Sequence, residues 1–262
     1  RGPARRPLRL LDACFGLGYN TFALLTEPSL ASRPVEVIGI EKERGVLDRL
    51  GLLSDVFPSW REAIARLCDT GEAVHGLHRI RVHCQPLEAL GQGKTEWVGK
   101  GSLDLVFHDA FTPSKCPELW CVELFQAYHT LLRCGGAVLS YTSANPVCAA
   151  CSEVGFSVRW TEPVDRRQGG LLAVKRDADA KGEAQHDPRW RELWERTTAA
   201  APYRRGAVGE ADGNDAHLRE GMLKAWAREK EALVNAGRLT IKRWLRSGGR
   251  GAPWPSRGPR GS

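Results

Sequence analysis

The first residues whose types and spacing point to chemistry are an acid and two glycines near the start of the chain. Asp12 ends a short apolar run, and Gly16 and Gly18 follow it. Glycines in a strand-to-helix turn let the backbone approach a ligand closely, where a side chain would block it. The turn is not a full G-x-G-x-x-G fingerprint, because Phe15 stands where dinucleotide-binding proteins have a further close-approach residue. A tight structural corner without a ligand is the alternative interpretation.

A second acid strengthens the ligand-binding interpretation. Glu41 ends the next predicted strand, 25 residues after Gly16, where an acid can accept hydrogen bonds from both ribose hydroxyls. A short glycine turn with no pyrophosphate to hold suits S-adenosyl-L-methionine better than NAD. Asp12 would then face the methionine ammonium, because opposite charges favour both ionised forms. The alternative is that Glu41 is a solvated loop acid.

Two further turns carry polar groups that fit the same chemistry. Gln85 follows the third predicted strand, and its side-chain carbonyl can accept a hydrogen bond from an adenine amino group, unless the turn is simply surface. Asp109 ends the fourth predicted strand and can hold an amine nucleophile and receive its proton. Phe111 and Pro113 would form an apolar wall for a planar base. Alternatively, Asp109 caps the following turn or helix and Pro113 only punctuates a loop.

These residues need strands and helices that bring them to one edge of a sheet. Hydrophobic patterning predicts seven strands, at 8–13, 35–40, 79–84, 103–108, 137–142, 156–162 and 170–175. Helical patterns lie at 21–25, at Leu47 to Leu53, at 62–68, at 118–133 with Gly135 and Gly136 as the stop signal, and at 146–153. The alternation predicts an α/β fold with a mostly parallel sheet covered on both faces and an antiparallel hairpin at one edge.

Two strings make the sequence recognisable. Residues 11–20 read LDACFGLGYN, and residues 109–120 read DAFTPSKCPELW. Together they resemble the MnmC-like methyltransferases, which form the S-adenosyl-L-methionine-dependent half of bifunctional tRNA 5-methylaminomethyl-2-thiouridine biosynthesis proteins and also occur as stand-alone enzymes. The resemblance covers about residues 8–176 and includes the later Gly135-Gly136 pair and the YTSA string at 141–144.

The resemblance implies a Rossmann-like class I methyltransferase fold. It also implies N-methylation of 5-aminomethyl-(2-thio)uridine at the tRNA wobble position, with S-adenosyl-L-methionine as cofactor and tRNA as partner. Asp109 and Phe111 would lie at the methyl-transfer site, and Pro113, Lys115 and Trp120 would meet the substrate, although Trp120 alternatively packs the start of a helix. The implied cofactor-binding residues are Asp12, Phe15, Gly16, Gly18, Asn20, Glu41, Gln85 and Asp109.

Three departures from the family shape the expectation. Seven residues precede the first predicted strand, so we expect the N-terminal part of the domain to be truncated. Gln85 stands where the family usually has an acid. Residues 177–262 contain no second strand-glycine-helix site for an FAD oxidase, so the chain is expected to perform only the methyl step. A separate enzyme would then supply the aminomethyl-uridine.

The composition changes along the chain. We expect a methyltransferase domain over residues 1–176 and a basic, low-complexity extension over 177–262. The net charge is +7, and residues 215–262 alone hold 11 basic and 4 acidic residues. Clustered positive charge favours a polyanionic partner such as nucleic acid, here the tRNA backbone, or a membrane surface, whereas the alternative is a solvated tail. A helix is predicted over 215–246, and Trp226 and Trp244 would pack this helix against the domain. Residues 247–262 are predicted to be disordered.

Composition also excludes several classes of protein. A chain of 262 residues with 42% hydrophobic and 26% charged residues is neither a small disulfide scaffold nor wholly disordered. No run approaches the roughly 18 apolar residues of a membrane span, and no secretion signal is visible. We expect a cytoplasmic protein without a membrane or metal partner. The eight cysteines are scattered, and Cys148 and Cys151 have no second pair for zinc, which favours free structural thiols.

Two other functions remain open from the sequence. One is a non-catalytic RNA-binding or scaffold protein on a degenerate methyltransferase fold. The other is a methyltransferase for a different amine, such as a small polyamine. The enzyme hypothesis depends on one spatial condition: Asp109 and the turn at Gly16 and Gly18 must meet at one place.

Overall fold

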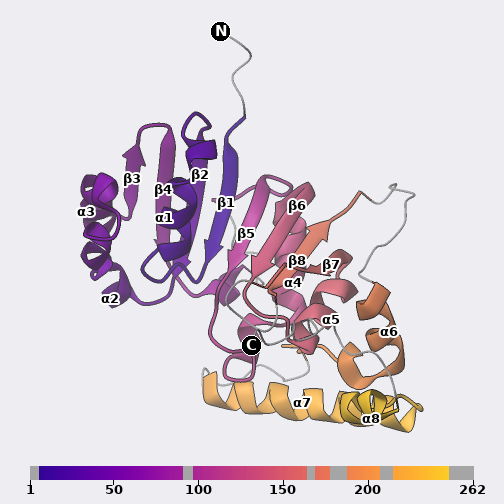
Figure 1. Ribbon diagram of the computed structural model, residues 1–262. Coiled ribbons are helices and arrows are strands. Elements are labelled where there is room, and N and C mark those ends of the chain that lie inside the picture. The colour runs from indigo at the N-terminus through magenta and orange to yellow at the C-terminus, as the bar shows by residue number, and fades with distance from the viewer. Residues whose placement is uncertain (1–5, 91–96, 164–168, 178–187, 207–214, 248–262) are drawn as a thin grey trace, which may run out of the picture. The chain divides into compact units, whose positions relative to one another are not determined.

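The computed structural model describes residues 6–90, 97–163, 169–177, 188–206 and 215–247 (Figure 1). The chain divides into two compact units. The first comprises Arg1–Ala110 and Thr130–Val138, and the second comprises Phe111–His129 and Leu139–Ser262. The expected domain boundary near residue 176 stays a prediction.

The described residues form an α/β arrangement of strands and helices. The strands are β1 (Leu8–Ala13), β2 (Val35–Glu41), β3 (Glu72–His75), β4 (His78–Cys84), β5 (Leu103–His108), β6 (Leu132–Ser140), β7 (Phe156–Trp160) and β8 (Leu171–Lys175). The α-helices are α1 (Tyr19–Leu25), α2 (Arg44–Leu47), α3 (Arg61–Thr70), α4 (Val122–Leu131), α5 (Asn145–Glu153), α6 (Pro188–Arg196), α7 (Asp215–Asn235) and α8 (Ile241–Arg246).

The strand order of the first unit creates a switch point beside β1. Its strands are arranged in the order β3-β4-β2-β1-β5-β6. The chain moves outward from β1 to β2 and β4, and then returns to place β5 on the other side of β1, with all of these pairs parallel. Ala13 lies opposite both Ile40 and His108, so the carboxyl ends of β1, β2 and β5 are neighbours. Ligands of open parallel sheets bind at such a point.

One face of this sheet is buried under α1 and α3. Leu10, Val37 and Ile80 from the strands form a hydrophobic cluster with Phe22 of α1 and Ile64 of α3. Each of these side chains is nearly or fully buried, and full burial of such a side chain contributes about 1.5–3 kcal/mol. The cluster therefore fixes the backbone at the edge of the sheet where the predicted ligand site lies.

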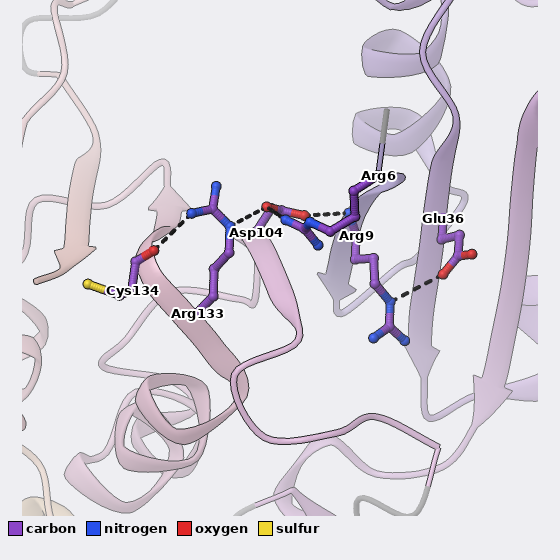
Figure 2. Close-up of polar contacts among 6 residues, drawn as sticks. All are labelled: Arg6, Arg9, Glu36, Asp104, Arg133 and Cys134. Carbon is purple, nitrogen blue, oxygen red and sulfur yellow. Dashed lines mark hydrogen bonds and ion pairs between the residues drawn. The ribbon is translucent and has the colours of Figure 1, made fainter. Parts of the chain in front are cut away.

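A buried carboxylate ties the opposite, N-terminal ends of the strands together (Figure 2). The Asp104 side chain at the start of β5 is 3% exposed and accepts hydrogen bonds from the guanidinium groups of Arg6 and Arg133. It also accepts one from the backbone N–H of Arg9 in β1, at 2.8 Å. Burial raises the pKa of Asp104, but these hydrogen bonds outweigh it and leave the pKa below its usual value.

The second unit contains an antiparallel pair of strands and several helices. β7 and β8 pair from Phe156 opposite Lys175 to Trp160 opposite Leu171, as the sequence predicted. The α5 helix packs on β7 and buries Cys148 and Cys151 on its inner side. Trp190 of α6 is fully buried, with its ring centroid 5.9 Å from that of Trp160 in an edge-to-face arrangement. The extension therefore packs on the hairpin through a tryptophan that sequence analysis did not single out.

The structure confirms the mixed α/β fold and corrects three details of it. Among the described residues there are eight strands rather than seven, because the short β3 forms a hairpin with β4. The helix predicted at 118–133 is only α4, and Gly135-Gly136 lie inside β6 rather than ending a helix. A Cβ on Gly136 would lie 3.2 Å from the carbonyl oxygen of Asp104, so close strand approach explains that glycine. The leucine-rich segment after β2 forms α2 and a separate 3-10 helix, Leu50–Ser54.

The predicted helix over 215–246 is two helices, α7 and α8. Gly237 adopts a φ of 89°, and the N–H of Arg238 bonds to the carbonyl of Leu233, which is the hydrogen-bonding pattern of a Schellman end. Thr240 then begins α8 and accepts a hydrogen bond from the N–H of Arg243. Of the segment predicted to be disordered, residues 248–262 lie outside the described residues.

Within the described part of the chain, every helix is too short or too polar to cross a lipid bilayer.

We predict that Asp104→Asn lowers the free energy of unfolding by about 2 kcal/mol at pH 7, because a buried acceptor of charged hydrogen bonds is lost. Glu36→Gln is the control, because its ion pair with Arg9 is partly exposed, with Glu36 at 44%, and pairs open to solvent contribute about 0–1 kcal/mol. Urea unfolding with circular dichroism measures both.

The same experiment at low pH tests the cause. The folded-state pKa of Asp104 lies below its ordinary value of 3.8, so its stabilisation is complete above about pH 4 and is lost as the pH falls through the folded pKa. The difference between wild type and Asp104→Asn should therefore shrink at pH 3. A constant difference from pH 3 to pH 7 would contradict this interpretation.

Candidate active site

The glycine turn follows β1 directly and leads into α1. Cys14, Gly16 and Gly18 all adopt positive φ angles, of 62°, 56° and 77°. Positive φ costs little at glycine and more at Cys14, so the sequence of the turn matches its backbone at two of the three positions. A Cβ at Gly16 would meet only the carbonyl oxygen of Cys14, at 3.9 Å, so there is open space on that side of the turn.

Phe15 has a different place from the one expected of a ligand-contacting residue. Its side chain is 4% exposed and belongs to the hydrophobic cluster beneath the sheet face. A Cβ on Gly18 would come within 2.5 Å of the Phe15 ring, and one on Gly39 within 2.6 Å. The absence of a side chain at Gly18 is therefore explained by the packing of Phe15 as well as by the positive φ.

Glu41 is tied to the glycine turn. Its Oε2 accepts a hydrogen bond from the N–H of Gly16 at 2.9 Å, and its Oε1 accepts one from the N–H of Glu43 at 2.9 Å. The carboxylate is thus held by two backbone donors at the end of β2. Each oxygen keeps a further lone pair for another donor. This position differs from that of a freely solvated loop acid.

Asp12 is a buried acid with an incomplete set of hydrogen bonds. Its side chain is fully buried at the last residue but one of β1, and its Oδ2 accepts a hydrogen bond from the Thr21 hydroxyl at 2.6 Å. Its Oδ1 is buried without a hydrogen-bond partner among the described residues. Burial is the main cause that raises the pKa of Asp12 to about 7, and the negative charge of Asp109 raises it further. Thr21 carries no sequence motif, and only this contact reveals that it belongs to the site.

Asp109 contacts the residues that follow the glycine turn. Its Oδ2 accepts a hydrogen bond from the side-chain amide of Asn20, at 3.0 Å. Asn20 is the second residue of α1, directly after the glycine turn, and Asp109 directly follows β5. The two segments lie 89 residues apart in sequence. The spatial condition set by the sequence is therefore met within the first unit, while the chemical roles of these residues stay predictions.

Gln85 lies beside Glu41 at the next strand end. The N–H of Gln85 donates to the carbonyl oxygen of Glu41 at 2.9 Å. Its side-chain Nε2 is buried without a hydrogen-bond partner among the described residues. The side-chain amide thus has hydrogen-bonding capacity available for a ligand.

The predicted substrate residues belong to the second unit. The Phe111 side chain is 83% exposed and Lys115 is exposed, whereas Pro113 is buried. Trp120 is fully buried, and its indole N–H donates to the carbonyl oxygen of Phe111 at 2.8 Å. Trp120 was predicted either to meet the substrate or to pack the start of a helix, and its burial corresponds to the packing role. The prediction that its ring contacts RNA is corrected accordingly, because the ring has no exposed surface.

The pair Cys148 and Cys151 has the environment of structural thiols. Both side chains are fully buried, and burial raises the pKa of Cys148 to about 12 and that of Cys151 well above its usual value. Thiolates are the form that binds metals, so this environment favours the free-thiol interpretation. No group of three or more potential metal ligands occurs in the part of the chain that the structure describes.

Comparison with known proteins gives concordant matches. Residues 70–176 match a protein family described as S-adenosyl-L-methionine-dependent methyltransferase. A tRNA 5-methylaminomethyl-2-thiouridine biosynthesis bifunctional protein, MnmC, of Marinomonas sp. (strain MWYL1) is 32% identical over 167 residues, which is 57% of this chain and 23% of that protein. An uncharacterized protein of Methanocaldococcus jannaschii is 28% identical over 183 residues, 64% of this chain and 46% of that protein.

A solved structure has the same fold. The crystal structure of MnmC2 from Aquifex aeolicus superposes with a TM-score of 0.64 at 24% sequence identity, covering 85% of this chain and 69% of that one. The chain spans less than half the length of each of these two curated relatives.

The strand order, the glycine turn and these matches define a Rossmann-like, S-adenosyl-L-methionine-dependent methyltransferase domain. Within that class, the domain is MnmC-like.

The residues of the first unit fit this cofactor. Asp12 has an unpartnered, buried carboxylate oxygen that suits a cationic group, and Glu41 is a fixed acceptor that suits ribose hydroxyls. Gln85 has an unpartnered amide that suits the edge of an adenine ring, and the backbone at Gly16 is open to a ligand. A buried acid beside a second acid favours a bound cation, because the cation offsets both the burial and the like-charge repulsion.

We predict that the affinity for S-adenosylhomocysteine rises about tenfold from pH 6 to pH 8. The pKa of Asp12 is about 7, so its ionised fraction rises about tenfold over this range, and the ionised form attracts the ligand's ammonium. Asp12→Asn should bind more weakly at pH 8 and lose the pH dependence. Isothermal titration calorimetry measures these affinities.

The matched control is 5′-methylthioadenosine, which lacks the amino-acid part of the ligand. Its affinity should not follow the titration of Asp12. If the two ligands show the same pH profile in wild-type protein, Asp12 does not face the ammonium.

Proposed function

We propose that the chain transfers a methyl group to the amine of 5-aminomethyl-(2-thio)uridine at the wobble position of tRNA. The observation that carries this proposal is the hydrogen bond between Asn20 and Asp109, which joins a carboxylate suited to an amine to the cofactor turn. The similarity to proteins named for 5-methylaminomethyl-2-thiouridine biosynthesis in tRNA supports the substrate. The cofactor supplies, when bound, a methyl carbon made electrophilic by a sulfonium.

Asp109 is the proposed catalytic residue. The substrate amine must be neutral to attack the methyl carbon, and after attack the nitrogen must lose a proton. Asp109 would orient the amine by accepting a hydrogen bond and then receive that proton. Because Asp109 is exposed, it can pass the proton on to water. Asn20 fixes one carboxylate oxygen and leaves the other free to meet the amine.

The remaining residues divide between cofactor and substrate. Asp12, Glu41, Gln85 and the backbone of the glycine turn would bind the cofactor. Phe111, which follows Asp109 after one residue, offers an exposed ring that suits stacking on a base. Exposed Lys115 in the same loop suits a phosphate of tRNA.

The proposal includes three expectations beyond the reaction. Because this substrate already carries a primary amine, another enzyme must install the aminomethyl group before methylation. Modification of tRNA also implies a cytoplasmic location. The basic C-terminal extension suits the tRNA backbone, in which case binding weakens steeply with salt.

The direct test is methylation of tRNA. Purified protein, S-adenosyl-L-methionine and tRNA from cells that lack the methyl step should yield 5-methylaminomethyl-uridine, detected by mass spectrometry of nucleosides. Deleting the gene should remove this nucleoside from the cellular tRNA pool. An unchanged pool would overturn the tRNA assignment, and methylation of a polyamine instead would favour the other amine substrate. Failure of the folded protein to bind S-adenosylhomocysteine would favour a scaffold.

We predict that Asp109→Asn lowers kcat about 100-fold while the Kd for S-adenosylhomocysteine stays within about threefold of wild type. Removing the negative charge of Asp109 takes away part of the attraction for the ligand's ammonium, but it also lowers the pKa of Asp12, so more of Asp12 is ionised at pH 7 and the two effects offset each other. Single-turnover methylation and calorimetry give the two quantities. Asp55→Asn is the control, because Asp55 is 93% exposed and lies outside the proposed site. Equal losses of turnover and cofactor binding would refute the role of Asp109.

A further inference from the structure

The loop that carries Phe111 is closed on itself by two buried side chains. The carbonyl oxygen of Phe111 accepts hydrogen bonds from the Trp120 indole at 2.8 Å and from the Cys116 thiol at 3.1 Å. Both donors are buried, while the Phe111 ring is exposed. These two hydrogen bonds therefore fix the backbone of Phe111, while its aromatic ring remains exposed to solvent.

An ion pair joins this loop to the long helix α7 of the extension. The Glu118 side chain is 2% exposed and accepts a hydrogen bond from Nε of Arg219 at 2.8 Å. Glu118 lies in the 3-10 helix Pro117–Leu119, between Cys116 and Trp120, and Arg219 lies in the second turn of α7. A carboxylate this deeply buried is costly without its cation, so the position of the loop depends on Arg219.

A second set of contacts holds the residues that directly follow the loop. The N–H of Val122 donates to the carbonyl of Tyr203 at 3.0 Å, and the Glu123 carboxylate accepts from the N–H groups of Arg205 and Gly206. The Tyr203 ring in turn packs on Trp226 of α7, with the ring centroids 5.2 Å apart. The indole N–H of Trp226 also donates to the carbonyl of Ala201 at 2.9 Å. Helix α7 thus holds the end of the loop directly through Arg219 and indirectly through residues 201–206.

We propose that Arg219 is a positioning residue of the substrate site: through Glu118 it holds the loop 111–120 in the form that presents Phe111 to the substrate base. Residues 201–206 and helix α7 are then a working part of the methyltransferase rather than a dispensable basic tail. The catalytic half of this inference rests on the proposed function, whereas the hold of Arg219 on the loop does not.

The test compares Arg219→Met with Arg219→Lys, which keeps the charge. Lys224→Met is the matched control, because Lys224 lies on the same helix and pairs only with the exposed Glu220 among the ion pairs described. Two readouts report the loop without any substrate: the rate of tryptic cleavage after exposed Lys115, and the rate of alkylation of buried Cys116 by iodoacetamide. Mass spectrometry quantifies both at these two residues.

We expect Arg219→Met to raise both rates about tenfold, because local opening becomes more frequent once the buried carboxylate loses the arginine cation. The same variant should lower kcat for tRNA methylation about tenfold while the Kd for S-adenosylhomocysteine is unchanged, because a misplaced base slows the chemistry. Arg219→Lys should stay within about threefold of wild type in every readout, and Lys224→Met should match wild type. If Arg219→Met does not fold, Glu118→Gln replaces it, because that variant weakens the link to Arg219 and leaves no buried charge unpaired. Both rates should then still rise above wild type, but by less than tenfold.

Two outcomes overturn the inference. One is wild-type rates of cleavage and alkylation in Arg219→Met, which would mean that Arg219 does not hold the loop. The other is an open loop with unchanged kcat and KM, which would mean that the loop does not serve the substrate. If wild-type protein binds S-adenosylhomocysteine but methylates no tRNA, the proposed function fails. Cleavage and alkylation then still decide whether Arg219 holds the loop.

Discussion

The parallel pairing of β1 with β2 on one side and β5 on the other is the constraint on which the site depends. It makes the carboxyl ends of three strands neighbours, so the residues that follow each strand must share one edge of the sheet. The glycine turn, Glu41 and Asp109 are then brought together by backbone hydrogen bonds rather than by their own attraction. The sheet can therefore hold the carboxylates of Asp12 and Asp109 close although they repel one another, because its folding energy outweighs this repulsion.

That arrangement gives the site its electrostatic character. Asp12 is buried, its pKa is raised, and the charge of Asp109 contributes to the rise. Such a pair favours the approach of a cation, and a sulfonium cofactor with an ammonium group carries positive charge of this kind. At the opposite end of the sheet, Asp104 meets arginine donors and its pKa falls. An aspartate thus stabilises the fold at the amino ends of the strands, as Asp104, whereas at the carboxyl ends another aspartate, Asp12, is available to bind a ligand.

Much of the fold and of the site was predictable from local patterns. Apolar runs that end at Asp12, Glu41 and Asp109 marked the strand ends, and the register of parallel strands then implied that these acids converge. The glycine turn was recognisable because positive φ angles favour glycine. The short strand β3 was missed because four residues give too little alternation for a strand to be recognised. The break between α7 and α8 was missed because a Schellman end at a single glycine leaves the apolar period almost undisturbed.

The sequence by itself determined the class of fold, the strand ends and the residue types available for binding, since these follow from the period of apolar residues and from backbone preferences. Only the tertiary structure decided which groups lack partners, which side chains pair across the chain and which are exposed. Trp120 and Phe111 illustrate the difference, since both are aromatic residues of one motif, yet one is fully buried and the other is 83% exposed. Burial and long-range pairing, as between Glu118 and Arg219, depend on contacts between segments distant in sequence, and local patterns carry no information about them.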